Sequence, residues 1–211
     1  MVVIPLSKKP PSVVYWLEDN LYLNITNRCP NNCFFCLRKF KSGVGGFNLK
    51  LREEPQPEEV LSEIERVINR KSWREIVFCG FGEPLERLDC IIQVAMLIKA
   101  RHGIAVRINT NGQGLLLNKG RNVIKELKEA GVDKLSISLL ANDKSTYDYI
   151  CKPTLENAFE SVIEFIRKAK SEINTEVTAV TIPEVDISKV RELANMLDAS
   201  FRTRQYIACI W

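Results

Sequence analysis

The sequence is organised around one stretch, Cys29-Pro30-Asn31-Asn32-Cys33-Phe34-Phe35-Cys36, which directly follows an alternating, strand-like run at residues 21–26. Its cysteines, spaced C-x3-C-x2-C, put three thiols on one short loop with no fourth ligand nearby. A structural zinc site closes its tetrahedron with four protein ligands. A [4Fe-4S] cluster needs one thiolate per iron, so three thiolates leave one iron open. The leading hypothesis is a cluster whose fourth iron binds something other than protein.

The composition is typical of one globular domain. The 211 residues are 45% hydrophobic and 27% charged, which is enough apolar sequence for a substantial core. Apolar runs fall short of the roughly 18 residues that span a bilayer. The first residues show no basic region, and Pro5 interrupts them, so we expect neither a signal peptide nor an anchor. We expect a lead-in at residues 1–12, a single core domain at 13–211, and a cytoplasmic protein with no membrane partner.

Charge and cysteine content exclude fewer classes of protein than the overall composition does. The net charge of +4 is a mild excess, and the basic residues are scattered along predicted helix faces such as 125–129. Nucleic-acid binding is neither supported nor excluded. Seven cysteines, an odd number, argue against a disulfide framework in a chain without a secretory signal. Reduced thiols suit a metal or cluster site.

Hydrophobic periodicity predicts strands and helices in alternation. A hairpin covers residues 13–26, and its second strand, 21–26, is the first of six strands separated by helices. The other strands are expected at 75–79, 104–109, 132–139, 175–182 and 200–207, and the helices near 57–68, 86–101, 119–130, 143–150, 155–170 and 188–197, the last capped by Ser188. Such alternation predicts a parallel sheet with right-handed crossovers.

The strands carry polar residues on one face at a period of two. They are Tyr22, Asn24, Thr26, Arg107, Asn109, Ser136, Ser138, Arg202, Arg204 and Tyr206, and the residues between them are mostly apolar. A curved sheet with a polar concave face fits this pattern, although strand-edge positions would also explain it. Six strands are too few to close like the eight-stranded barrel. The predicted fold is α/β: an open partial (β/α)6 barrel with parallel strands and a short N-terminal hairpin.

Two motifs together resemble those of the radical S-adenosylmethionine (SAM) superfamily. The cysteine loop follows the first strand of the series, and Gly80-Phe81-Gly82-Glu83-Pro84 follows the second. The resemblance extends from residue 21 to residue 206. The sequence of residues 22–33 is also similar to that of a branch of the family linked with TatD-type hydrolases. The usual second motif reads Gly-Gly-Glu-Pro, and here Phe81 stands at the first glycine position, which leaves less room for the backbone.

The resemblance implies a definite chemistry. Cys29, Cys33 and Cys36 would each ligate one iron of a [4Fe-4S] cluster, and SAM would bind the fourth. An electron passed through the cluster would cleave SAM and release a 5′-deoxyadenosyl radical, which abstracts hydrogen from a substrate. The residues expected to contact SAM are Phe35, Gly80, Phe81, Gly82, Glu83, Pro84, Asn109, Asn111, Ser136, Ser138, Ile182, Arg202 and Arg204.

Physical reasons support several of these positions. Glu83 would accept a charge-assisted hydrogen bond from the SAM amino group, and the glycines would let backbone approach the ligand closely. Phe35 would pack by the adenine or shield the cluster. Arg202 and Arg204, two residues apart on one strand, face the same way and need an anion, either the SAM carboxylate or an acidic substrate. A solvated edge strand is the alternative for both arginines, and Arg107 could join them.

The remaining cysteines receive structural interpretations. Cys90 lies on a core helix face, and Cys151 and Cys209 are buried or incidental thiols, with a substrate-proximal place for Cys151 as a further possibility. Cys79, beside the glycine turn, is the one plausible extra ligand.

Three functions remain open at this stage. The first is a radical SAM enzyme that takes an electron from an external low-potential donor of the flavodoxin or ferredoxin type and acts on an unidentified substrate. The second is an activase that installs a glycyl radical in a protein partner. The third, of another class, is a non-catalytic iron–sulfur or zinc-binding protein. The finer resemblance adds a possible TatD-type hydrolase as a partner.

Overall fold

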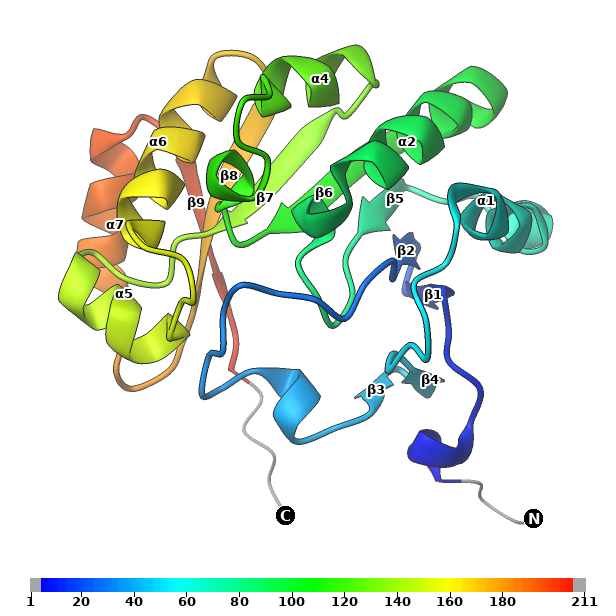
Figure 1. The fold of residues 1–211 in the computed structure, drawn as a ribbon, viewed down its shortest axis with the longest axis horizontal. Helices are drawn as coiled ribbons and strands as arrows, with labels where there is room; N and C mark the ends of the chain where they lie inside the picture. Colours follow the sequence, from blue (N-terminus) through cyan, green and yellow to red (C-terminus); the bar gives the residue numbers. More distant parts are fainter. Residues whose placement is uncertain (1–4, 207–211) are drawn as a thin grey trace.

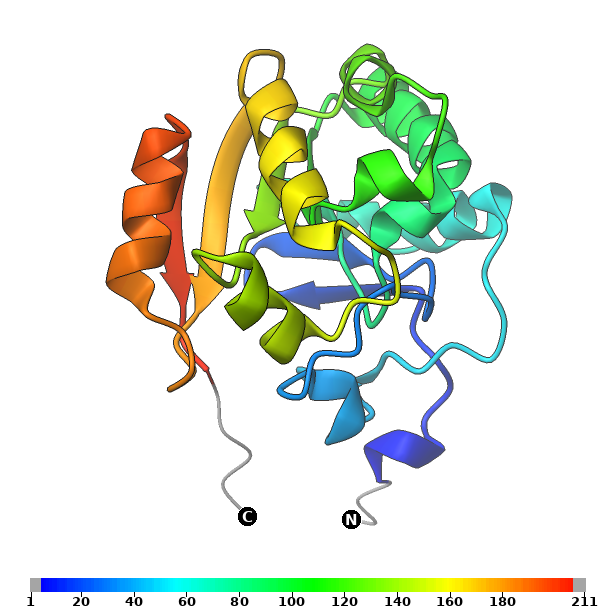
Figure 2. The ribbon, with the colours of Figure 1, turned by 60° about the vertical axis from the view of Figure 1, so that its left-hand side comes forward.

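The computed structural model describes residues 5–206, which form one curved sheet with helices packed along it (Figures 1 and 2). Within these residues the sheet has seven strands in the order β1-β2-β5-β6-β7-β8-β9. β1 and β2 form an antiparallel hairpin, and all later neighbours are parallel. The strands are β1 Val14–Leu17, β2 Asn20–Leu23, β5 Glu75–Phe78, β6 Ala105–Thr110, β7 Lys134–Ser138, β8 Asn174–Val180 and β9 Ser200–Arg204. Two short strands, β3 Gly43–Val44 and β4 Phe47–Asn48, pair with each other.

The helices connect the parallel strands. They are α1 Pro57–Glu65, α2 Leu88–His102, α3 Gly114–Leu117, α4 Val123–Glu129, α5 Lys144–Cys151, α6 Ala158–Lys170 and α7 Ile187–Met196, with 3-10 turns η1 Leu6–Lys8, η2 Leu37–Lys39, η3 Ile68–Arg70 and η4 Pro84–Arg87. α2 packs on β6, α6 on β8 and α7 on β9. Figure 1 shows these helices packed along one face of the sheet. The segment from β2 to β4 runs past the carboxyl ends of the strands.

The apolar faces of the strands build the core beneath the helices. Val106, Ile108, Leu135 and Ile137 are completely buried, and the polar residues that alternate with them in β6 are only half-buried. The edge strands β1 and β9 do not pair with each other, so the sheet is open. The predicted open partial (β/α)6 barrel with an N-terminal hairpin is confirmed.

Several predicted boundaries are shifted for identifiable reasons. The strand at 21–26 ends at Leu23, because the Asn24 side chain donates to Leu49 O at 2.9 Å and the chain leaves the sheet there. The helix expected from residue 155 begins at Ala158, since Asn157 adopts a left-handed conformation with φ of 56°. The last strand, expected to reach residue 207, ends at Arg204. Ile207 and Cys209 lie outside the described residues.

The predicted cap of the last helix is wrong. Asp186, not Ser188, precedes α7, and its carboxylate accepts hydrogen bonds from the backbone N–H groups of Ser188 and Lys189 at 3.1 and 3.2 Å. An aspartate at this position satisfies N–H groups that have no partner within the helix, and its charge opposes the helix dipole.

We therefore expect Asp186→Ala to lower the melting temperature by about 2–4 °C, because it removes the cap of α7. Ser188→Ala should change it by less than half as much. Thermal unfolding of both variants, followed by circular dichroism, measures the difference, and equal shifts would contradict the assignment of the cap.

Candidate active site

The three cysteines lie on the loop after β2, at the carboxyl end of the sheet. The turn after β5 holds this loop through its backbone. Gly82 N donates to Thr26 O at 3.0 Å, and Glu83 N donates to Arg28 O at 2.7 Å. The glycine turn is therefore hydrogen-bonded to the residues that directly precede Cys29.

Both glycines of this turn lie against the cysteine loop's own chain. A Cβ atom added to Gly80 would lie 2.0 Å from Asn24 Oδ1, and one added to Gly82 would lie 2.4 Å from Arg28 O. No side chain fits at such distances, so Gly80 makes room for the Asn24 side chain and Gly82 for the backbone of Thr26 and Arg28. Their expected approach to SAM, like the contact expected of the neighbouring Phe81, stays a prediction.

The other side of the cysteine loop docks on the end of α5. Asn32 N donates to Cys151 O at 2.9 Å, and Thr154 N donates to Pro30 O at 2.8 Å. The Thr154 hydroxyl donates to the same Pro30 carbonyl across 124 positions of sequence. Sequence patterns gave no signal for this contact, because nothing local in either segment marks its partner.

A buried chain of polar groups accompanies this docking. Gln113, which is fully buried, donates through Nε2 to Asn31 Oδ1 at 2.6 Å and to the Tyr147 hydroxyl at 3.0 Å. Tyr147 is hydrogen-bonded in turn to Cys151, one helical turn further along α5, and Cys151 to Cys33. The chain of contacts ends on a predicted cluster ligand. The substrate-proximal role considered for Cys151 is not tested, but its thiol is buried against this loop.

The loop thiols differ in their electrostatic surroundings. Burial raises the pKa of Cys29 to about 12, and it also raises the pKa of Cys36. The hydrogen bond with Cys151 lowers the pKa of Cys33. Asn111 Nδ2 lies 3.9 Å from Cys29 Sγ and donates to it.

The donor set fits a cluster held by three ligands. All three cysteines are free and half-buried, and Arg38 beside them supplies positive charge. Among residues 5–206, no three His, Cys, Asp or Glu side chains converge so as to hold a single metal ion. A [4Fe-4S] cluster does not require convergence on one point, because each thiolate binds a different iron.

Glu83 is a buried carboxyl group at the centre of the site. Oε1 accepts from Leu85 N at 3.1 Å and from the Thr110 hydroxyl at 2.7 Å, and Oε2 accepts from Asn111 N at 2.6 Å. Burial raises its pKa to about 7. A carboxylate has about four lone-pair sites, so three donors leave one for a ligand. Its contact with SAM was expected from the sequence, but its capping of η4 and its attachment to the end of β6 were not.

A paired layer of charges, here called the lumen floor, crosses the polar face of the sheet. It consists of Glu75, Arg107, Lys134, Glu176 and Arg202. Arg107 Nε lies 2.8 Å from Glu75 Oε2, Arg202 Nη2 lies 2.8 Å from Glu176 Oε2, and Lys134 Nζ lies 3.3 Å from Glu176 Oε1. Neither carboxylate was predicted from the sequence, although Glu176 is in register with Ser136, and Glu75 lies two residues before Val77, which is in register with Arg107. Arg202 thus already has a carboxylate partner.

Arg204 differs from the arginines of the lumen floor. Its Nη2 donates to the Ser138 hydroxyl at 2.7 Å, two strands away. Its Nε is buried without a hydrogen-bond partner, and no carboxylate pairs with it, among the residues that the structure describes. Burial lowers its pKa. Arg204 lines a cavity of about 270 Å³ together with Phe35 and Tyr206, whose rings meet edge-on at 6.4 Å.

The other predicted SAM contacts are distributed around this cavity and the lumen floor. Asn109 accepts from Arg107 at 2.7 Å, and Ser136 donates to Glu176 at 3.4 Å, so both contact the lumen floor. Ile182 is buried in the core, and Pro84 is buried at the start of η4. Cys79 and Cys36 line a second cavity, of about 230 Å³. The structure therefore brings Phe35, Glu83, Asn111, Ser138 and Arg204 around the cysteine loop.

Comparison with known proteins agrees with this geometry. Residues 23–197 match the family model of the radical SAM superfamily. This chain belongs to the radical SAM superfamily. It is accordingly a radical SAM enzyme, with a [4Fe-4S] cluster and SAM as the cofactors of its family, and enzymes of the family generally take their electron from an external donor.

The chain is also similar to individual curated proteins and to solved structures. The chain is 31% identical over 150 residues to a probable GTP 3′,8-cyclase of Pyrococcus abyssi, covering 71% of this chain and 43% of the relative. It is 38% identical over 128 residues to a GTP 3′,8-cyclase of Lactiplantibacillus plantarum, covering 58% and 34%. The fold superposes on Streptococcus suis SuiB bound to SAM with a TM-score of 0.68 at 16% identity, covering 90% of this chain and 40% of that one. The chain thus spans less than half the length of these relatives. Within residues 5–206, none of the helices has the length and apolar character needed to cross a membrane.

The close approach at Gly82 yields a test of how this radical SAM site is held together. Gly82→Ala should lower the free energy of unfolding by about 1–3 kcal/mol, because the new methyl group pushes the β5 turn away from the cysteine loop. The displaced loop should also retain less iron after anaerobic reconstitution, measured as iron per chain.

Gly103→Ala is the matched control. Gly103 ends α2 with φ of 64° and open space around it, so alanine there strains the backbone without touching the site. Equal iron loss in both variants at equal stability would show that Gly82 has no special place in holding the loop.

Proposed function

We propose that this radical SAM enzyme acts on a small anionic molecule held in the lumen by Arg204. The observation that carries the proposal is the buried Nε atom of the half-buried Arg204, which has no hydrogen-bond partner and no carboxylate partner in the described part of the chain. A buried charge is costly unless it is paired. An anion from outside the chain would supply the missing partner.

The surroundings of Arg204 favour this interpretation. Arg107 and Arg202, the nearest other guanidiniums, are already neutralised by Glu75 and Glu176, and their positive charges add to the lowering of the Arg204 pKa. An arriving carboxylate or phosphate would relieve that repulsion and satisfy Nε, and guanidinium binds both groups bidentately.

The names of several relatives also support an anionic substrate. Several are named GTP 3′,8-cyclases, and GTP is a polyanion. The chain covers less than half of their length, so GTP itself serves here only as a probe of the proposed class of substrate.

The residues around the cysteine loop would have separate roles. Cys29, Cys33 and Cys36 would hold the cluster, which together with SAM supplies reductive cleavage of the sulfonium and a radical that abstracts hydrogen. Glu83, with one lone-pair site left, would accept a charge-assisted hydrogen bond from the SAM ammonium group. Phe35 would form an apolar wall that excludes water, and Ser138 would orient Arg204 through the hydrogen bond at 2.7 Å.

For Glu83, the informative variant is Glu83→Gln. The neutral amide keeps the shape of the carboxyl group, and with its oxygen toward Leu85 N and Thr110 it leaves only Asn111 N without an acceptor. It weakens the attraction for the SAM ammonium, so the Kd of SAM should rise about tenfold with iron content unchanged. Isothermal titration of reconstituted protein measures this. Unchanged SAM affinity would show that the role of Glu83 is confined to capping η4 and joining β6. Glu83→Ala would leave three buried donors unpaired and is a poor test, because it also destabilises the fold.

For Arg204, we expect Arg204→Gln to raise the Kd of GTP by about 10- to 100-fold, because a charge-assisted contact is lost. The Kd of SAM and the yield of 5′-deoxyadenosine with a chemical reductant should stay within about twofold of wild type. Arg202→Gln is the control, since that guanidinium is already paired. A selective loss of SAM affinity in Arg204→Gln would instead assign Arg204 to the SAM carboxylate and contradict the proposal.

Two finer hypotheses from the sequence stay predictions. An activase would install a glycyl radical in a partner protein, detectable by electron paramagnetic resonance after incubation with reduced enzyme and SAM, and that result would replace the small-molecule proposal. A TatD-type hydrolase partner would be detected by co-purification.

A further inference from the structure

The segment that carries the cluster ligands has an unusual charge distribution. Between Asp19 and Glu53 the sequence contains no acidic residue, while it contains Arg28, Arg38, Lys39, Lys41, Lys50 and Arg52. The chain as a whole is nearly balanced, with 30 basic and 26 acidic residues. The excess positive charge is therefore concentrated around the cysteine loop.

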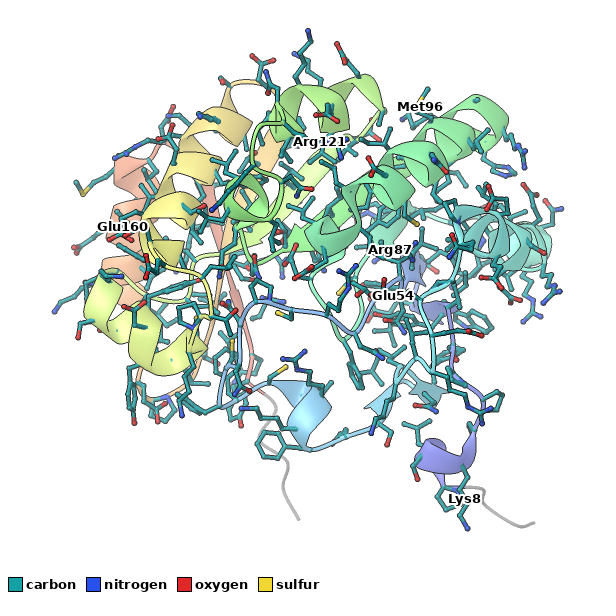
Figure 3. All side chains as sticks on the ribbon, viewed as in Figure 1. Lys8, Glu54, Arg87, Met96, Arg121 and Glu160 are labelled. Atoms are coloured by element: carbon teal, nitrogen blue, oxygen red, sulfur yellow. The ribbon has the colours of Figure 1, made fainter. Side chains whose placement is uncertain are left out.

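The distribution of ion pairs also distinguishes this segment from the helices. Most lysines and arginines on the helices have a carboxylate partner, as Lys99 has Asp133 and Lys128 has Glu172. We define the basic face as the exposed lysines and arginines without a carboxylate partner near the loop, in the part of the chain that the structure describes: Lys8, Lys9, Lys39, Lys41, Lys50 and Arg52. The nearest carboxylate in sequence that forms an ion pair, Glu54, is taken by Arg28 and Arg87, and Figure 3 shows Glu54 beside Arg87.

Part of the basic face lines a depression beside the β3–β4 hairpin. A cavity of about 600 Å³ is lined by Lys8, Lys9, Lys50 and Arg52, with Ser42 on its edge. Lys41 precedes Ser42 and follows η2, which begins directly after Cys36. In both ribbon views, η1 and η2 lie at the same end of the molecule, beyond the carboxyl ends of the strands (Figures 1 and 2). Phe40, half exposed, stands between Lys39 and Lys41 in the sequence and lines the cavity of Arg204, not this depression.

The chain itself fixes this surface. Asn48 donates to Lys9 O at 2.7 Å, Ser12 N donates to Asn48 O at 2.7 Å, and Lys9 Nζ donates to Gly46 O at 3.0 Å. These contacts tie η1, which lies in the segment expected to be a loose lead-in, to the β3–β4 hairpin. Six like charges held on one side raise the local potential and favour an acidic partner.

We propose that the basic face is the docking surface for the external electron donor, an acidic flavin or iron–sulfur protein of low potential. The inference rests on the family's requirement for such a donor and does not depend on the nature of the substrate. The donor would be oxidised by one electron, and a cluster held by Cys29, Cys33 and Cys36 would be reduced by one, with no bond made or broken in the transfer. Exposed basic residues on the segment that carries the three cysteines suit a transient contact with an acidic electron-transfer protein.

The test uses the reconstituted enzyme and a purified flavodoxin, with Lys41→Glu/Lys50→Glu as the variant. Both lysines are exposed and have no part in the proposed cluster, SAM or substrate contacts. At low ionic strength the Kd for flavodoxin, measured by isothermal titration, should rise about tenfold. Salt near 0.5 M should remove most of the difference, since exposed charges are screened. Cluster reduction by flavodoxin hydroquinone should slow, while SAM cleavage driven by dithionite stays unchanged.

Lys119→Glu/Arg167→Glu is the matched control, because both residues are exposed, lie away from the cysteine loop and make the same change in charge. It should bind flavodoxin like wild type. Equal weakening in the control, or unchanged binding in the basic-face variant, would overturn the proposal. Loss of dithionite-driven SAM cleavage in the basic-face variant would also overturn it and would assign the face to cofactor or nucleic-acid substrate. Failure of the Arg204 proposal would leave all of these readouts unaffected.

Discussion

The contact between the β5 turn and the cysteine loop is the constraint on which the site depends. Two backbone hydrogen bonds join Gly82 and Glu83 to the loop, and no side chain fits between them. The Glu83 carboxyl group then turns inward, caps η4 and reaches the end of β6. Glu83 therefore holds the cysteine loop, the start of η4 and the end of β6 in fixed positions relative to one another. The turn that is expected to contact SAM also connects these parts of the structure.

Charged residues are arranged in layers around Glu83 and the cysteine loop. The lumen floor is neutralised by Glu75 and Glu176, Arg204 above it lacks a carboxylate among the described residues, and the basic face lies on the outside. A negatively charged molecule thus finds compensating charge both at the surface and within the lumen. The proposed electron donor and substrate would use separate parts of this arrangement, since the basic face and Arg204 line different cavities.

Sequence patterns predicted the fold well, because strand alternation and helix periodicity are local signals. They identified the six parallel strands and both motifs, but Asn157 and Asp186 show that helix starts depend on single side chains and backbone angles. The site was only partly predictable. Polar positions on one face were recognised, yet whether an arginine is paired depends on a neighbouring strand, as with Arg202 and Glu176. The docking of α5 on the cysteine loop joins segments 124 positions apart, and a single sequence carries no signal for such a partner.

That docking has a consequence for how the protein is made. The cysteines are synthesised early, but the buried contacts of Asn31 and Cys33 need Gln113, Tyr147 and Cys151, which follow far later in the chain. Contacts between such distant positions form late, because the intervening chain must be ordered first. A nascent chain that stops before α5 carries all three thiols without the surface that shapes their loop. The order of synthesis thus delays an organised cluster site until α5 has emerged, and it leaves these thiols exposed until then.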